Sequence, residues 1–510
     1  MKRAKHSLSN YKLATMNQGQ LVPIGLTEIL PGDSIQHATS ALVRVAPLVT
    51  PVMHPCHIRI HHWFVPNRLV WANGIDDSWE AFITGGHDGL DASVFPTITP
   101  NTGSGYAVGT LADYFGIPTG VDDLAHSAIP FRGYSLIWNE FYRDQDLQTP
   151  LVIDTTGGPD TTTNTTLQNV CWEKDYFTTS RPWAQKGPAV SLPLGTSAPV
   201  KTASSSTVTG AQTALQLLNA TGSVAGANEI YGTGPGGSTL HTYAAAGAPG
   251  GSGAYPANLY ADLSVATAAT VNELREALAI QRYEEARARY GSRYTEYLRY
   301  LGVRSSDARL QRPEYLGGGK QTISFSEVLQ TGVTTSGTPN TGVGTMAGHG
   351  IGAVRSNRYR RFFEEHGYVY SLMSVLPKTM YVNGLPRHFS RTTKEDFWQK
   401  ELEHIGQQEV KYKEVYWAHA TPEGTFGWQD RYDEYRRIEN SVSGEFRTTL
   451  NAWHLGRIFS SDPALNAAFV GANPTTRVYQ ATAANQLYVM AMHSIQARRL
   501  VAKEGTSSIL

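Results

Sequence analysis

Alternating apolar and polar positions predict long β-strands near both ends of the chain. The strand signal begins near Ala38, runs through residues 40–48 and returns in residues 56–65, where Ile58, Ile60 and Phe64 share one face. Residues 368–375 and 485–498 have the same character towards the other end. Hundreds of loop-rich residues separate these groups, and an antiparallel sandwich closed by its first and last strands would produce that layout.

Helical spacing is clear only in residues 270–301. Thr270 and Glu273 have the T-x-x-E spacing of a capping box, and an apolar series at helical intervals follows them. Gly291 is a plausible stop, and a second, shorter helix is expected from Tyr294 to Leu301. The simplest interpretation is that both helices cover loops of the sandwich.

The segment from Val190 to Tyr260 is rich in Gly, Ala, Ser, Thr and Pro. Its only charged residues are Lys201 and Glu229. A disordered linker would have this composition, but linkers are usually more polar and more charged. A large surface insertion on a β scaffold is therefore an equally good interpretation.

Whole-chain composition narrows the class of protein. The 510 residues are 41% hydrophobic and 17% charged, and 43 basic residues balance 43 acidic ones. A neutral chain is suited to packing against copies of itself, and any contact with nucleic acid must be local. Two cysteines, Cys56 and Cys171, form no disulfide framework, which favours synthesis in a reducing bacterial cytoplasm. No signal peptide and no run of about 18 apolar residues is found, so no membrane span is expected.

Local positive charge is concentrated in residues 1–20. This polar arm contains no acid, and its basic residues are Lys2, Arg3, Lys5 and Lys12. A flexible, solvated tail would explain these charges as well as an inward-facing arm that binds DNA. Both interpretations stay open at this stage.

The sequence nominates no catalytic group and no cofactor. Residues 317–320 (GGGK) lack the first glycine and the Ser or Thr of a phosphate-binding loop, and G-x-G-x-x-A at residues 342–347 is better explained as a flexible loop. No G-x-S-x-G motif occurs. His57 and His61 would lie about 13 Å apart on one strand face, too far to share a metal ion, so ordinary strand or interface histidines are the favoured interpretation.

Several stretches, in a constant order, give the sequence a family resemblance. They include residues 63–71 (WFVPNRLVW), 112–120 (ADYFGIPTG), 138–145 (WNEFYRDQ), 175–183 (DYFTTSRPW), 306–318 (SDARLQRPEYLGG) and 427–432 (GWQDRY). From about residue 20 to the C-terminus, the chain resembles the major capsid protein of the Microviridae, particularly of the gokushovirus-like small single-stranded DNA phages.

The resemblance implies a structural protein, not an enzyme, with an all-β, eight-stranded antiparallel jelly roll over residues 21–510. It implies sixty copies in a T=1 shell around circular single-stranded DNA, assembled in the host cytoplasm and carried in the virion. Small DNA-binding, pilot or scaffolding virion proteins and a host-surface receptor are the implied partners. Residues 190–260 are similarly placed to an insertion that builds three-fold protrusions in such phages.

Two other functions stay in view. A receptor-binding spike or lectin-like sandwich would usually show internal repeats, and none is found. A hydrolase on a β scaffold would need a catalytic constellation that the sequence does not contain.

Overall fold

The structure is a computed structural model that describes most of the chain. It describes residues 3–86, 93–100, 103–188, 190, 271–291, 293–304, 306–331 and 343–503, with six short strands between residues 200 and 261. By its contacts the chain divides into two units, Met1–Lys186 with Arg287–Leu510, and Gly187–Ala286. Most of the segment 190–260, as well as Lys2 and Thr270, lies outside the described residues.

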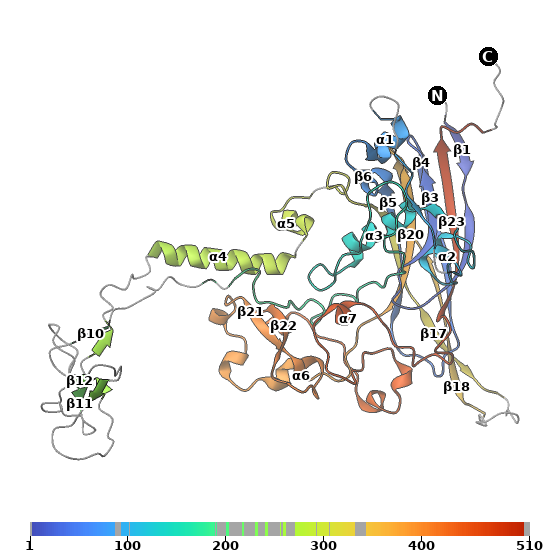
Figure 1. The fold of residues 1–510 in the computed structure, drawn as a ribbon. Helices are drawn as coiled ribbons and strands as arrows, with labels where there is room; N and C mark the ends of the chain where they lie inside the picture. Colours follow the sequence, from blue (N-terminus) through green and yellow to red (C-terminus); the bar gives the residue numbers. More distant parts are fainter. Residues whose placement is uncertain are drawn as a thin grey trace. The chain divides into compact units, whose positions relative to one another are not determined.

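The first unit is built on two antiparallel sheets that lie face to face (Figure 1). The larger, seven-stranded sheet has the order β1-β23-β4-β18-β17, with β2 also pairing with β23 and β19 with β4. Its strands are β1 (Ala4–Ser7), β2 (Asn10–Met16), β4 (Ser34–Val45), β17 (Ser324–Leu329), β18 (Met346–Arg355), β19 (Tyr359–Phe362) and β23 (Leu487–Arg499).

The second sheet has four strands in the order β16-β5-β20-β3. They are β3 (Val22–Ile29), β5 (Cys56–Pro66), β16 (Glu314–Thr322) and β20 (Gly367–Pro377). Every pairing in both sheets is antiparallel, and the central β5–β20 pair is in continuous register from Cys56 opposite Pro377 to Pro66 opposite Gly367.

The main core lies between the two sheets and takes side chains from both. Val43 and Val489 of the larger sheet and Ile58 and Met373 of the smaller one belong to one buried cluster. Burying these apolar side chains provides the main driving force for closing the sandwich. The fold is therefore a mostly β, antiparallel sandwich.

Strand β18 approaches the core so closely that three of its inward positions, Gly348, Gly350 and Gly352, are glycines. A Cβ atom on Gly348 would lie 2.6 Å from the carbonyl oxygen of Thr50, and one on Gly352 would lie 2.6 Å from Cδ1 of Ile58. The glycines of residues 348–352 are therefore a packing requirement of a strand, whose partners are β17 and β4.

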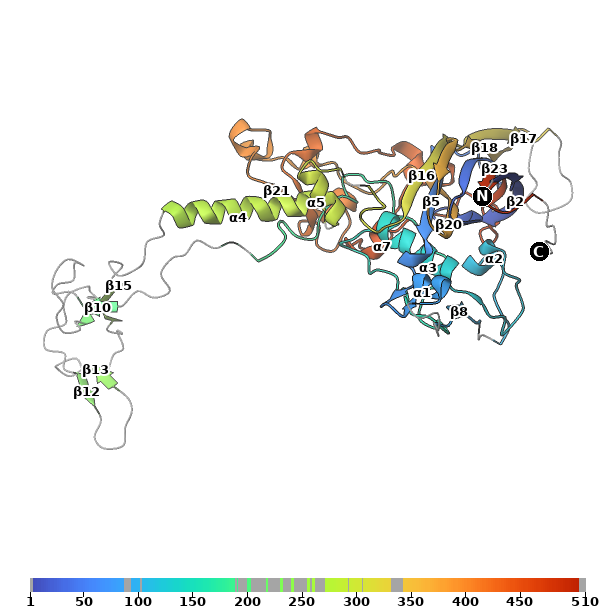
Figure 2. The same ribbon diagram turned by 90° about the horizontal axis from the view of Figure 1, so that it is seen from above.

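Loops and short helices cover the smaller sheet (Figure 2). Phe131 and Tyr134 of α3 (Ile129–Ile137) share a buried cluster with Trp63 of β5 and Tyr370 of β20. The remaining helices are α1 (Trp79–Thr84), α2 (Leu111–Phe115), α3 (Ile129–Ile137), which continues as a π-helix over Trp138–Tyr142, α5 (Tyr294–Tyr300), α6 (Tyr412–Val415) and α7 (Ala467–Val470). Two-stranded sheets are formed by β6 (Ala72–Asn73) with β7 (Asp77–Ser78), β8 (Thr97–Ile98) with β9 (His126–Ser127), and β21 (Gln407–Lys411) with β22 (Thr425–Asp430).

The second unit has three short pairs of strands. They are β10 (Val200–Thr202) with β15 (Leu259–Ala261), β11 (Leu217–Leu218) with β14 (Tyr255–Pro256), and β12 (Ile230–Gly232) with β13 (Leu240–Thr242). Helix α4 (Val271–Tyr290) begins in this unit and ends in the first. No helix among the described residues is long and apolar enough to cross a bilayer.

The strands expected in residues 40–48, 56–65, 368–375 and 485–498 are confirmed as β4, β5, β20 and β23, and both expected helices are confirmed as α4 and α5. The N-terminal segment differs from the flexible tail that its polarity suggested. Residues 4–7 and 10–16 are strands paired along β23. Residues 317–320 also differ from a phosphate loop, because they lie inside strand β16.

Candidate nucleic-acid interface

The outward face of the seven-stranded sheet carries exposed aromatic and apolar side chains. Along β23, Val489, Ala491 and Ile495 point into the core and are almost fully buried. The intervening residues Tyr488, Met490 and Met492 are 39–45% exposed. The alternation follows from the two-residue period of a strand, which sends successive side chains to opposite faces.

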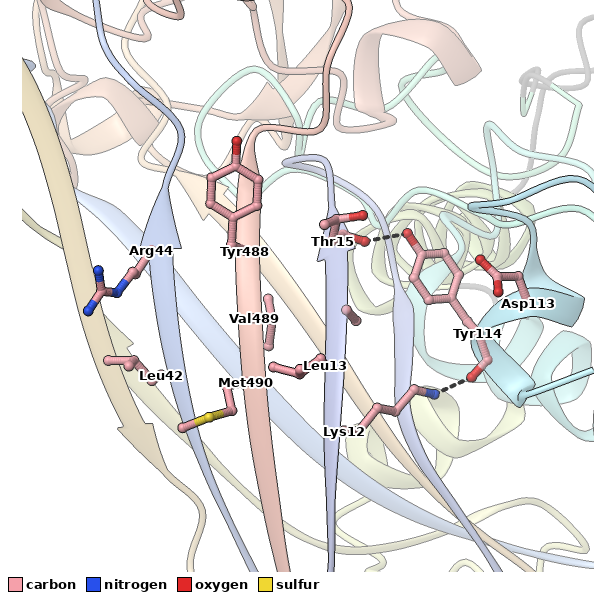
Figure 3. Close-up of a pocket in the computed structure, with 11 residues that line it drawn as sticks. Lys12, Leu13, Thr15, Leu42, Arg44, Asp113, Tyr114, Tyr488, Val489 and Met490 are labelled. Atoms are coloured by element: carbon pink, nitrogen blue, oxygen red, sulfur yellow. Dashed lines mark hydrogen bonds between the residues drawn. The ribbon is translucent and has the colours of Figure 1, made fainter.

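Strand pairing extends these rows across the sheet. Leu13 of β2 and Leu42 of β4 lie opposite Met490, while Tyr11 lies opposite Met492. Tyr11 and Leu13 are exposed by 68% and 79%. A shallow groove of about 650 Å³ lies here. In Figure 3, Leu13, Leu42 and Met490 lie side by side across three strands, with Arg44 and Tyr488 towards one end.

Positive charge on this face comes from five basic residues. They are Lys5, Arg44, Arg355, Arg360 and Arg498. Lys5 and Arg498 stand opposite each other, while Arg44 stands opposite Tyr488, Arg355 opposite Ser40 and Arg360 opposite Gln36. None of the five makes an ion pair with a described residue. Among the outward positions of the described strands of the seven-stranded sheet there is no Asp or Glu; the carboxylate that lines the groove is Asp113 of α2. The face therefore combines net positive charge with aromatic rings.

The structure separates the four basic residues that the sequence proposed as DNA contacts. Lys5 is exposed on the outward face. Arg3 donates hydrogen bonds to the Gly32 carbonyl at 2.9 Å and to Ser34 Oγ at 3.0 Å, and its guanidinium lies over the ring of Phe362. Lys2 lies outside the described residues.

Lys12 points the other way. Its Nζ donates to the carbonyl oxygen of Pro23 at 3.0 Å and to that of Tyr114, as Figure 3 shows for the second bond. Burial lowers the pKa of Lys12 to about 8, although nearby Asp113 opposes this shift. Its ammonium group is thus engaged inside the subunit, unlike that of Lys5.

Sequence reasoning missed most of the positive residues on this face. Arg44, Arg355, Arg360 and Arg498 are far apart in the sequence and come together only through pairing with the central strands β4 and β23. The available signal was the strand alternation itself: continuing it through residues 485–498 places Tyr488, Met490 and Arg498 on the face opposite Val489 and Ile495.

A separate group of polar side chains is buried between the two sheets. His37 and His493 come from the larger sheet and His62 from the smaller one, and all three are almost fully buried. His493 Nε2 donates to the Ile24 carbonyl at 2.9 Å, so its Nδ1 accepts from the Thr39 hydroxyl, also at 2.9 Å. Thr39 Oγ1 can then accept from His37 Nε2 at 3.0 Å.

This pattern of hydrogen bonds fits imidazole rings that are neutral. The second nitrogen of His37 lies 3.1 Å from the Tyr359 hydroxyl, and His62 is bracketed by Ser371 Oγ at 2.9 Å and Ser356 Oγ at 3.0 Å. Burial lowers the pKa of His37 to about 3 and lowers the pKa of His62 and of His493. The hydroxyl partners and the lowered pKa values indicate a structural role, in which the network links the sheets.

The described residues offer no alternative metal site. In the part of the chain that the structure describes, no group of three or more His, Cys, Asp or Glu side chains is placed to hold a metal ion. His57 Nδ1 lies 3.1 Å from Thr322 Oγ1, and His61 Nδ1 lies 2.7 Å from the Tyr142 hydroxyl, so the two neighbours on β5 have separate partners. Burial raises the pKa of the Cys56 thiol, which keeps it protonated and unreactive.

Comparison with known proteins places the whole chain among phage coat proteins. The family model described as "Capsid protein (F protein)" matches residues 1–509. Capsid protein VP1 of Bdellovibrio phage phiMH2K is 36% identical over 499 residues, covering 92% of this chain and 88% of the relative. Capsid protein VP1 of Chlamydia phage 1 is 32% identical (93% and 90% covered), and that of Spiroplasma virus 4 is 31% identical (92% and 87% covered).

Proposed function

We propose how this chain builds a virion. The premise is that the chain belongs to the phage capsid protein (F protein) family. Membership follows from a match that spans residues 1–509 and from relatives more than 30% identical over nearly their whole length. The chain is accordingly a structural capsid protein of the Microviridae, not an enzyme, and its place is the virion. That full-length match is the observation that carries the function.

The fold within this family is, we propose, an eight-stranded jelly roll. Its eight strands in chain order are β2, β3, β4, β5, β16, β18, β20 and β23. They pair first with last, second with seventh, third with sixth and fourth with fifth. Nested pairing of this kind is that of one long antiparallel hairpin rolled into a sandwich, and it supports the jelly-roll assignment.

The proposed assembly is a T=1 shell of sixty copies around circular single-stranded DNA, formed in the host bacterial cytoplasm with small DNA-binding, pilot or scaffolding proteins. Long loops between the strands supply the surface that heterologous contacts need to close into an icosahedron. Cryo-electron microscopy of purified virions tests this directly. Particles with another copy number, or with this chain confined to an appendage as a spike would be, would contradict the proposal.

The outward face of the seven-stranded sheet is the proposed inner, DNA-facing surface. Five basic side chains that make no ion pair with a described residue can each neutralise a phosphate, and exposed Tyr11 and Tyr488 offer rings on which unpaired bases can stack. Lys5 is one of these five; Arg3, and Lys2, which lies outside the described residues, stay DNA contacts proposed from the sequence, and Lys12 is the weakest member of the proposal because of its internal hydrogen bonds.

Ultraviolet cross-linking of intact virions tests the DNA-facing surface. We expect DNA adducts on peptides that contain Tyr11 and Tyr488. Adducts confined to the opposite side of the sandwich, for example to Tyr315 or Trp63 of the smaller sheet, would contradict the assignment.

Residues 190–260 are proposed to form a surface insertion that meets the host receptor. Support comes from the near absence of charge, the small side chains, and the separation of Gly187–Ala286 as a unit with its own strand pairs. Replacing the segment with a short Gly/Ser linker should leave a folded, assembling subunit and impair host attachment. An unfolded subunit, or normal attachment, would contradict it.

A further inference from the structure

One edge of the seven-stranded sheet has no strand partner. β17 is the last strand on its side of the sheet, and among the described strands it pairs with β18 alone. Its register with β18 is continuous from Ser324 opposite Ile351 to Leu329 opposite Met346. Figure 2 shows β17 at the outer border of the sheet. A strand in this position presents backbone N–H and C=O groups to which a further strand can bond.

The hydrogen bonds of β18 show which residues of β17 present these groups. Gly348 exchanges both of its backbone hydrogen bonds with Leu48, at 3.1 and 3.4 Å, on the side of β18 that faces away from β17. Glu327, which lies opposite Gly348, is therefore at a non-hydrogen-bonded position, and its own N–H and C=O point away from β18. Strand alternation gives Phe325 and Leu329 the same orientation. None of these three residues of β17 has a backbone partner among the described residues.

The end of the β17–β18 hairpin also exposes apolar side chains on both of its faces. Leu329 and Met346 stand opposite each other on the core-facing side and are 50% and 39% exposed, while Val328 on the outward side is 49% exposed. β18 pairs with β4 only from Ile351 to Arg355, so this end of the hairpin lies beyond the paired part of β4. Large apolar side chains exposed on both faces of a strand end indicate a surface that another molecule covers.

Three other edge strands of the sandwich have features that hinder the addition of a strand. β3 contains Pro23 and has a register shift in its pairing with β20. β16 has a register shift and carries Lys320, and the four-residue β19 carries Arg360 and Arg361. β17 has no proline, lysine, arginine or register shift, and Glu327 is its one charged residue. Because an open edge of this kind promotes aggregation, we expect a defined partner to occupy it.

We propose that β17 of one subunit pairs antiparallel with β17 of a second copy across a two-fold axis, with Val328 opposite the partner's Val328. This contact rests on the proposed shell. Antiparallel pairing of two identical strands is itself two-fold symmetric, and an icosahedral shell contains two-fold axes. Because every copy carries the same edge, a second copy supplies one partner for each β17. The larger sheets of the two subunits then form one continuous sheet.

The register follows from the backbone groups and from charge. A register centred on residue 327 would put Glu327 opposite the partner's Glu327, and like charges directly opposite each other are destabilising. A register centred on Ser326 would put Leu329 opposite Ile323, whose N–H is already bonded inside its own subunit. The register centred on Val328 pairs Glu327 with the partner's Leu329 through their outward backbone groups. It also brings the two half-exposed Val328 side chains together.

A single cysteine tests this register in virions produced from the complete phage genome. In a non-hydrogen-bonded antiparallel pair the facing Cα atoms are about 4.5 Å apart, which is within disulfide range. Oxidised Val328→Cys virions should therefore give subunit dimers and no larger species. Ser326→Cys is the matched control: its two copies would lie four residues apart along the strands, or about 13 Å, so dimers should be at least about tenfold fewer. Wild-type virions should give none, since Cys56 is buried and Cys171 partly buried.

A proline provides a second readout. Glu327→Pro removes an N–H that the subunit's own sheet does not use and that the contact needs, so the isolated subunit should stay folded while particle yield falls by about tenfold. Glu327→Ala keeps this N–H, is the matched control and should give the wild-type yield. Circular dichroism of the isolated subunit reports the fold, and if Glu327→Pro does not fold, the cross-link decides.

Dimers from Val328→Cys, with a folded but poorly assembling Glu327→Pro subunit, support the contact. It is overturned by closed virions in which Val328→Cys gives no dimers, by dimers from Ser326→Cys in their place, or by a cross-link from Val328→Cys to a different virion protein. Wild-type yield from Glu327→Pro also overturns it. Failure of the wild-type chain to form closed shells would instead overturn the proposed function.

Discussion

The two sheets of the sandwich share one core but differ on their outward faces. On the smaller sheet, Trp63, Tyr370 and Leu372 point away from the main core and are still buried, because α3 and the loops around it pack over them. On the larger sheet, Tyr488, Met490 and Met492 occupy equivalent outward positions and remain exposed. Among the described residues, nothing comparable covers the outward face of the larger sheet, so this bare face is available to another molecule.

The largest expected effect is a difference in the free energy of unfolding between a truncation at a covered outward position and one at an exposed outward position. Leu372→Ala should lower the free energy of unfolding by about 2–5 kcal/mol, because it leaves a cavity beneath α3. Met490→Ala, an equivalent truncation on the bare face, should change it by no more than about 0.5 kcal/mol. Urea unfolding of the isolated subunit measures both. Equal losses would mean that the bare face is covered within the subunit as well.

Acid should weaken the interior that the two sheets share. The pKa of His37 is about 3 in the folded subunit and about 6.5 when unfolded, so below pH 6.5 the unfolded chain takes up a proton that the folded chain does not. Stability should therefore be constant above about pH 7 and fall as pH drops towards 3, by about 2 kcal/mol from His37 alone between pH 7 and pH 5.

Urea midpoints at pH 7 and pH 5 test this dependence. His37→Gln lowers stability at both pH values but should reduce the difference between them, whereas His349→Gln, at an exposed position of β18, serves as the control and should leave the difference unchanged. A difference in His37→Gln as large as in the wild type would show that other groups cause the acid sensitivity.

Sequence reasoning predicted the strands that form the core better than it predicted the residues of the bare face. Strands β5 and β23 were predicted because alternating Ile, Val and Leu side chains produce a clear period of two. Strand β2 was missed because its core-facing side chains are Lys12, Ala14 and Met16, which give little apolar contrast. The basic face was missed for a different reason: its residues are joined by strand register, which depends on pairings between segments hundreds of residues apart.

Removing charge from the bare face should affect DNA binding without affecting stability. Each phosphate contact contributes about −0.7 to the slope of log K against log salt on single strands, so R44A/R355A should make the slope less steep by about 1.4. The measurement is oligonucleotide binding by the isolated subunit over a series of salt concentrations. K394A/K400A, which removes two exposed lysines outside the seven-stranded sheet, is the matched control and should leave the slope unchanged. A double arginine variant with the wild-type slope would remove this face from the DNA interface.

The smallest expected effect distinguishes two lysines that are seven residues apart. Lys5 is exposed on the bare face, while the Lys12 ammonium donates to the carbonyl oxygens of Pro23 and Tyr114. Lys5→Ala should reduce the salt slope by about 0.7, because one phosphate contact is lost. Lys12→Met, which keeps the aliphatic stem, should leave the slope unchanged, because a cation that is already hydrogen-bonded and partly desolvated gains little by leaving its partners. If Lys12→Met reduces the slope as much as Lys5→Ala does, the Lys12 side chain leaves its carbonyl partners to reach DNA. The whole N-terminal segment, including its inward-pointing side, would then belong to the interface.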